Sequence, residues 1–122
     1  MMGEWKLADG EYRFAELVWE REPVNSTELA GLALERLGWK KSTCYTVLRK
    51  LCQRGILANE NATVTALVKR EQIRRMESEE LLKKSFGNSL PAFLNSFLQG
   101  RTLSAEEADE LQQMIDAARE KQ

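Results

Sequence analysis

Length, composition and charge exclude several classes of protein for this chain. It has 122 residues, of which 43% are hydrophobic and 30% are charged, and its formal net charge is −1. This composition is typical of a soluble globular protein with one domain or two small modules. The N-terminus lacks the apolar segment of a secretory signal, and no apolar run approaches the roughly 20 residues of a membrane span. We therefore predict a cytoplasmic protein without membrane insertion.

Residue types that usually carry catalysis or bind metals are scarce. The chain has no histidine, the commonest general base, and its only thiols are Cys44 and Cys52. Two thiolates are too few for a four-coordinate zinc site, and on one helix they would lie about 12 Å apart, too far for a disulfide. We interpret both as small core residues. We predict no catalytic residues, no metal and no cofactor, and we do not expect an enzyme.

Two amphipathic helices are predicted within the first 38 residues. The first begins at Asp9, a good N-cap, and ends before Pro23. Its buried face is predicted to contain Tyr12, Ala15, Val18 and Trp19. The second begins with Asn25 and Glu28, which are spaced as a capping box, and ends at Gly38. Its apolar stripe consists of Leu29, Leu32, Ala33 and Leu37.

A third helix, predicted from about Ser42 to Arg54, has two faces of opposite character. Its apolar residues recur at the spacing of one helical face, which is expected to pack against the first two helices. These residues are Cys44, Val47, Leu48, Leu51 and Cys52. The segment from Arg36 to Asn59 contains no acidic residue and six basic ones, namely Arg36, Lys40, Lys41, Arg49, Lys50 and Arg54. Such a concentration of charge is typical of a surface that contacts phosphates, with a plain solvated face as the alternative.

Two short β-like runs, "GILAN" and "ATVTALV", follow this helix and are separated by the turn residues "NEN". The order helix, turn, helix and hairpin predicts a winged helix-turn-helix over residues 1–68, whose third helix would lie in the major groove of double-stranded DNA. The fork of Arg49 suits a guanine edge, and Thr46 can reach a base, whereas the helix start suits phosphates. The predicted DNA-binding residues are Lys40, Lys41, Ser42, Thr43, Tyr45, Thr46, Arg49 and Lys50.

From Lys69 onwards the pattern is helical only and predicts three helices over residues 69–122. Their apolar surface exceeds what a segment of this size buries alone, so we predict a dimerisation domain. The alternative is that this surface packs back on the N-terminal module. The fold class is therefore mainly α, with a small hairpin. The predicted contacts between the two copies involve Ile73, Met76, Phe86, Phe93, Phe97, Leu111, Met114 and Ile115.

Over nearly its whole length the sequence resembles the penicillinase-repressor (BlaI/MecI) family of bacterial transcription regulators. "LADGEYRFAELVWE" is similar to the opening pattern of the family, "PVNSTEL" to the start of its second helix, and "WKKSTCYTVLRKLCQRGIL" to its recognition helix. "LVKREQIRRMES", "FGNSLPAFL" and "LSAEEADEL" are similar to its C-terminal dimerisation region. The resemblance implies a cytoplasmic homodimer that binds operator DNA of inverted symmetry and represses transcription, in the setting of antibiotic resistance.

The resemblance also implies a way in which repression ends. In the family, a membrane sensor-protease that detects a β-lactam triggers a cut in the C-terminal region. The matching bond here joins Ser96 and Phe97, where the family typically has Asn-Phe, and this difference leaves release by a small ligand open. The family's wing usually holds aromatic and basic residues, and "NENATVTALV" has neither. A winged-helix module that binds proteins is the alternative function.

Overall fold

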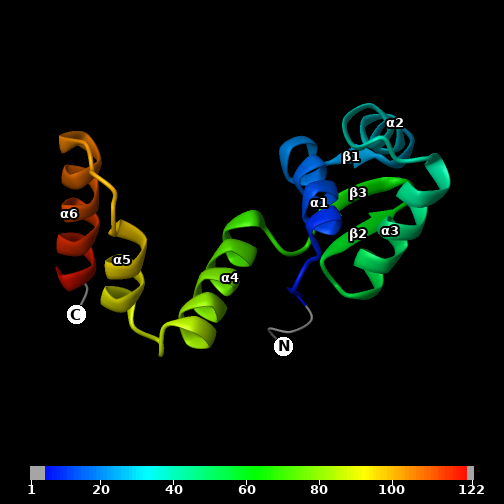
Figure 1. Ribbon diagram of the computed structural model, residues 1–122. Helices are drawn as coiled ribbons and strands as arrows, with labels where there is room; N and C mark the ends of the chain where they lie inside the picture. Colours follow the sequence, from blue (N-terminus) through cyan, green and yellow to red (C-terminus); the bar gives the residue numbers. More distant parts are fainter. Residues whose placement is uncertain (1–4, 121–122) are drawn as a thin grey trace. The chain divides into compact units, whose positions relative to one another are not determined.

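The computed structural model describes residues 5–120, and Figure 1 shows its helices and strands. The chain divides into two compact units between Leu81 and Leu82. The first unit contains α1 (Asp9–Arg21), β1 (Val24–Asn25), α2 (Ser26–Leu37), α3 (Lys41–Gln53), β2 (Leu57–Glu60), β3 (Thr63–Ala66) and most of α4 (Arg70–Ser85). The second contains the end of α4, α5 (Leu90–Leu98) and α6 (Ala105–Glu120). The predicted class, a mainly helical winged helix followed by further helices, is confirmed.

The start of α1 differs slightly from the sequence prediction. Asp9 is its first helical residue, and Ala8 occupies the N-cap position. The backbone N–H of Ala8 donates to a carboxylate oxygen of Glu11 at 2.9 Å. Glu11 therefore satisfies one of the backbone groups that the helix start leaves unpaired, although the side chain of Ala8 forms no capping hydrogen bond.

The ends of α2 follow the predicted signals more closely. The side chain of Asn25 accepts a hydrogen bond from the backbone N–H of Thr27 at 2.8 Å, as an N-cap does. Glu28, predicted to complete a capping box, lies 3.5 Å from Arg21 in an ion pair. Gly38 ends the helix with a φ of 71°, a conformation that glycine adopts without steric cost.

The sheet has three antiparallel strands in the order β1-β3-β2. The register places Leu57 of β2 opposite Ala66 of β3, and Val24 of β1 opposite Val64. Strand β1 is missing from the sequence prediction because two residues are too few to show alternation. The β2–β3 turn is tied to the start of α2, since the backbone N–H of Ser26 donates to the carbonyl of Ala62 at 2.8 Å.

One apolar core holds the helices and the sheet of the first unit together. Its buried side chains include Phe14, Val18, Leu29, Ala33, Cys44, Leu48, Leu51, Ile56, Leu57, Val64 and Ile73. Tyr12 and Trp19, predicted to be buried on α1, are only partly buried at the edge of this core. Ile73 and Met76 of α4 are both buried within the chain, and the compact unit runs to Leu81, past the change of sequence pattern at residue 68.

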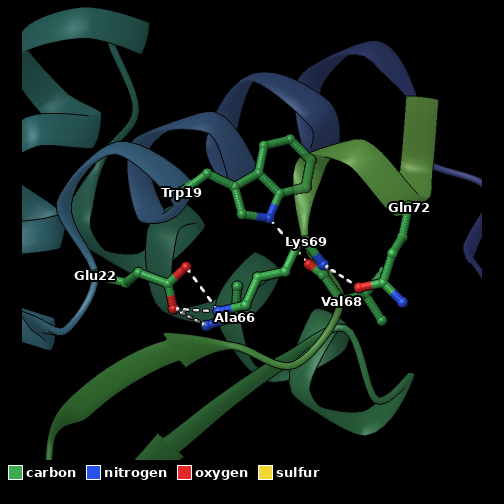
Figure 2. Close-up of polar contacts among 6 residues, drawn as sticks. All are labelled: Trp19, Glu22, Ala66, Val68, Lys69 and Gln72. Atoms are coloured by element: carbon green, nitrogen blue, oxygen red, sulfur yellow. Dashed lines mark hydrogen bonds and ion pairs between the residues drawn. The ribbon is translucent and has the colours of Figure 1, made fainter. Parts of the chain in front are cut away.

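A polar cluster joins the C-terminal end of α1 to the end of the wing and the start of α4 (Figure 2). The indole Nε1 of Trp19 donates to the carbonyl of Val68 at 3.0 Å. The carboxylate of Glu22 accepts from the backbone N–H of Ala66 at 2.9 Å and from Nζ of Lys69 at 3.0 Å. These contacts come from residues far apart in the sequence, and they fix the end of β3 against α1.

The second unit is organised differently, because no residue of α5 or α6 is buried. Its contacts are local. Phe93 lies edge-on to Phe86 with ring centroids 5.3 Å apart, and it stacks on Phe97 at 5.9 Å. Hydroxyl caps begin both helices, with Ser89 accepting from the N–H of Ala92 and Ser104 from that of Glu107.

The turn between β2 and β3 generates a prediction about stability. Asn61 and Ala62 have φ values of 51° and 65°, which lie in the left-handed region. A Cβ costs the folded state roughly 1 kcal/mol there. Replacing it with glycine removes this cost but also raises the conformational entropy of the unfolded chain, which offsets part of the gain in stability. We therefore expect Ala62→Gly to raise the free energy of unfolding in urea by about 0.5 kcal/mol. Ala58→Gly, within β2, is the control and should lower it; no gain for Ala62→Gly would contradict the turn geometry.

Candidate DNA-binding surface

The core fixes the orientation of α3 by burying one of its faces. Cys44, Leu48 and Leu51 of this helix are buried. The turn that precedes α3 is fixed as well, because Trp39 stacks on Phe14 with ring centroids 5.5 Å apart and planes 14° apart. The helix therefore has no freedom to rotate, and its opposite face is directed to solvent.

The residues predicted to bind DNA lie on or beside this exposed face. Seven are exposed, namely Lys40, Lys41, Ser42, Thr43, Thr46, Arg49 and Lys50, and Tyr45 is half-buried. Lys40 is the N-cap residue of α3, and the first turn contains no acidic side chain. The partial positive charge of the helix start therefore adds to the charges of Lys40 and Lys41.

Three of the six basic residues in the acid-free segment are paired with acids of α1. Arg36 lies 3.2 Å from Glu20. Glu11 pairs with Arg54 at 3.2 Å and with Lys50 at 3.9 Å. These partners have no signal in the sequence, because Glu11 and Arg54 are 43 residues apart and no local pattern joins them.

The other three basic residues are Lys40, Lys41 and Arg49. Within residues 5–120 none of them forms an ion pair. All three lie in the first three turns of α3 or at its cap, together with the hydroxyls of Thr43 and Thr46. The positive charges without an acidic partner therefore lie at the start of α3 and, with Arg49, in its third turn. Thr43 and Thr46, whose hydroxyls can bond to base edges, lie between them.

The wing contributes one further polar group beside this face. A shallow cleft of about 330 Å³ lies between α3 and β2, and its lining residues are Tyr45, Leu48, Arg49, Cys52 and Asn59. From the sequence, Asn59 is predicted at the end of a β-like run and the start of the turn that follows, with no role in DNA binding. Its amide belongs to β2 and lies at the same cleft as Arg49, which no sequence spacing indicates. The adjacent Glu60 is exposed and acidic, in agreement with a wing that lacks basic residues.

Comparisons with known proteins cover most of the chain. A model of the penicillinase repressor family matches residues 7–117. The chain belongs to this family. The penicillinase repressor of Bacillus licheniformis is 22% identical over 115 residues, which cover 91% of this chain and 90% of the relative. An uncharacterized 16.5 kDa protein of Latilactobacillus sakei is 27% identical over 120 residues, which cover 92% of this chain and 80% of the relative.

Membership of the penicillinase repressor family supports a transcriptional repressor, and the family is one of repressors rather than of enzymes. The resemblance drawn from the sequence motifs is thereby confirmed. Among the helices described by the structure, none has the length and apolarity to cross a membrane. Residues 5–120 contain no cluster of three or more His, Cys, Asp or Glu side chains that could hold a metal ion.

The two cysteines of this penicillinase repressor family member are free thiols on α3. Cys44 is buried and Cys52 is half-buried, which agrees with their interpretation as small core residues. Burial raises the pKa of both thiols above the ordinary value, because a thiolate is poorly solvated there. Thiolate chemistry at either position is therefore disfavoured near neutral pH.

The ion pairs lead to a prediction about which cations support the fold. Arg54 donates to Glu11 and to the backbone carbonyl of Lys6, whereas Arg49 is exposed without an ion pair in residues 5–120. We expect Arg54→Ala to lower the free energy of unfolding by about 1–2 kcal/mol, and Arg49→Ala to change it by less than about 0.5 kcal/mol. Urea unfolding of the two variants measures both values. Similar losses for the two arginines would show that Arg49 serves the fold.

Proposed function

We propose that this chain is a sequence-specific DNA-binding repressor of transcription that acts as a homodimer. The observation that carries the proposal is the uncompensated charge of Lys40, Lys41 and Arg49 on the exposed face of α3. These three cations have no acidic partner in residues 5–120. Phosphates of bound DNA would supply the missing negative charges. The family relation supports the same function.

The proposed roles follow from the chemistry of each side chain. Arg49 presents a planar fork for the O6 and N7 atoms of guanine, and Thr46, one turn earlier, reaches a neighbouring base. Phosphate contacts come from Lys40, Lys41 and Ser42 through charge and the helix N-terminus. Thr43, Tyr45 and Lys50 flank the base-reading residues and complete the surface.

These roles are tested by comparing two alanine variants on two duplexes. Arg49→Ala should cost about 1–3 kcal/mol on an operator selected from a random pool, and much less on a scrambled duplex, because a base contact is lost. Lys41→Ala should weaken both duplexes alike and flatten the dependence of log K on log salt by about one. Fluorescence anisotropy of the wild type and both variants, on each duplex at three salt concentrations, measures the binding constants. Binding that shows no salt dependence would favour a protein-interaction module instead.

Dimerisation is proposed for the second unit. Phe97, Met114 and Ile115 are 50%, 61% and 49% exposed, and neither α5 nor α6 buries a single residue within the chain. A segment of this size without a buried core gains its stability from a partner, and a second copy has the matching apolar surface. Phe86, Phe93 and Leu111 are half-buried beside these residues. Since Ile73 and Met76 are already buried within one chain, the proposed contacts rest on the other six residues.

Placing a charge on the exposed apolar face of α6 should dissociate the dimer. Burial of one isoleucine contributes about 1.5–3 kcal/mol, so Ile115→Glu should weaken association by at least roughly tenfold. Gln113→Glu, on the same helix, introduces the same charge at a polar exposed position and should leave association unchanged. Sedimentation velocity at micromolar concentration distinguishes the species. If the wild type sediments only as a 14.0 kDa monomer, the proposed dimer is wrong.

We further propose that a cut between Ser96 and Phe97 ends repression. Both residues are exposed on α5, a helix of nine residues that buries none of its side chains. Within a single chain, local opening of such a helix costs little, and an opened backbone is what a protease requires. In the proposed dimer, the contact of Phe97 with the second copy adds to this cost. The cut separates Phe97 and all of α6 from the rest of the chain, which removes most of the proposed contacts between copies. A monomer then loses the gain from two linked half-sites.

The proposed switch is tested in cells that carry a β-lactam-responsive sensor-protease. After a β-lactam challenge, mass spectrometry should detect a fragment that ends at Ser96, together with expression of the repressed genes. Ser96→Asp at the bond is expected to block the cut, because Ser96 is exposed and is not one of the proposed contacts between copies. Gln113→Asp adds the same charge at an exposed position away from the bond and is the control. If the genes are induced while the chain stays intact, proteolysis is wrong and release by a small ligand takes its place.

A further inference from the structure

We propose that Glu11 limits the sequence-independent affinity of this protein for DNA by offsetting the charges at the C-terminal part of α3. The inference rests on the proposed DNA-binding function. It concerns a residue outside the surface predicted from the sequence. Glu11 lies on α1, and it contacts α3 through two basic side chains.

The carboxylate of Glu11 is held in place by three partners. One oxygen accepts from the backbone N–H of Ala8 at 2.9 Å and from the guanidinium of Arg54 at 3.2 Å. The other lies 3.9 Å from Nζ of Lys50. The side chain is only 15% exposed, so water screens its charge less than that of a surface carboxylate. Glu11 is therefore a fixed negative charge beside α3.

This fixed charge divides the basic residues of α3 into two groups. Lys40, Lys41 and Arg49 have no acidic partner in residues 5–120, whereas Lys50 and Arg54 share Glu11. Lys50 is 62% exposed and lies next to Arg49 in the sequence, so it could also reach a phosphate. A phosphate contact by Lys50 competes with its attraction to Glu11.

The consequence concerns all DNA sequences alike. Non-specific binding depends almost entirely on the number of phosphates that a protein neutralises, and each one adds about 0.9 to the slope of log K against log salt. Base contacts by Arg49 and Thr46 do not involve Glu11. Because Glu11 attracts Lys50 away from phosphates, it lowers the affinity of the repressor for non-specific DNA. Non-specific sites in a genome compete with the operator for the repressor.

Glu11→Gln is the variant that tests this inference. The amide oxygen of glutamine can still accept from Ala8 and Arg54, so the local structure is preserved while the charge is removed. Binding of the full chain to a selected operator and to a scrambled duplex is measured between 50 and 200 mM salt. Glu79→Gln removes the same charge from an exposed ion pair with Arg75 on α4 and is the matched control.

Glu11→Gln should neutralise one more phosphate and so bind the scrambled duplex more tightly than the wild type at 50 mM salt. Between 50 and 200 mM salt, the affinity of the variant should fall by roughly threefold more than that of the wild type. Adding Lys50→Ala to Glu11→Gln should abolish this gain. The same affinity and slope for Glu11→Gln and Glu79→Gln would overturn the inference, and so would a gain that survives Lys50→Ala.

A second comparison tests the inference even if Glu11→Gln fails to fold. In the otherwise unchanged chain, Lys41→Ala should flatten the salt slope by about 0.9, and Lys50→Ala should flatten it by much less. Equal effects would overturn the role of Glu11 while leaving the proposed function intact. If the wild type binds neither duplex in a salt-dependent manner, the proposed function itself fails.

Discussion

The burial of one face of α3 is the constraint on which the proposed DNA surface depends. Cys44, Leu48 and Leu51 are enclosed in the core, and the stack of Trp39 on Phe14 fixes the turn before them. Interiors are packed too densely for a helix to rotate without losing these contacts. The positions of Thr46 and Arg49 toward solvent therefore follow from residues outside the proposed DNA surface. One face of α3 packs in the core, and the opposite face carries the proposed contacts with DNA.

Electrostatics adds a second constraint that acts over long sequence distances. Helix α1 is bound to the basic segment through Glu11 and Glu20, which pair with Arg54 and Arg36. Such pairs contribute little to stability where they are exposed, but they decide which positive charges stay available for phosphates. A nearly neutral chain can thus carry a local positive surface, because its acids lie beside some of its cations and away from others.

The helices and the two-faced character of α3 could be predicted because their signals are local. Helical spacing of apolar residues predicted α1, α2 and α3, and Asn25 and Gly38 marked the ends of α2. The rest depends on contacts between distant segments. Strand β1 exists only because β3 lies beside it, and the approach of Asn59 to Arg49 depends on the fold of the wing. The pairing of Glu11 with Lys50 and Arg54 likewise has no signature within a window of neighbouring residues.

The two units differ in how they obtain their stability, and this difference has a functional consequence. The first unit has its own core, so it keeps its shape whether or not a partner is present. In the second, α5 and α6 bury no residue within the chain, and in the proposed dimer their order depends on the second copy. Dissociation would therefore loosen the second unit while leaving α3 folded. If the proposed dimer binds two half-sites, a signal that acts on α5 or α6 would end this cooperative binding without unfolding α3.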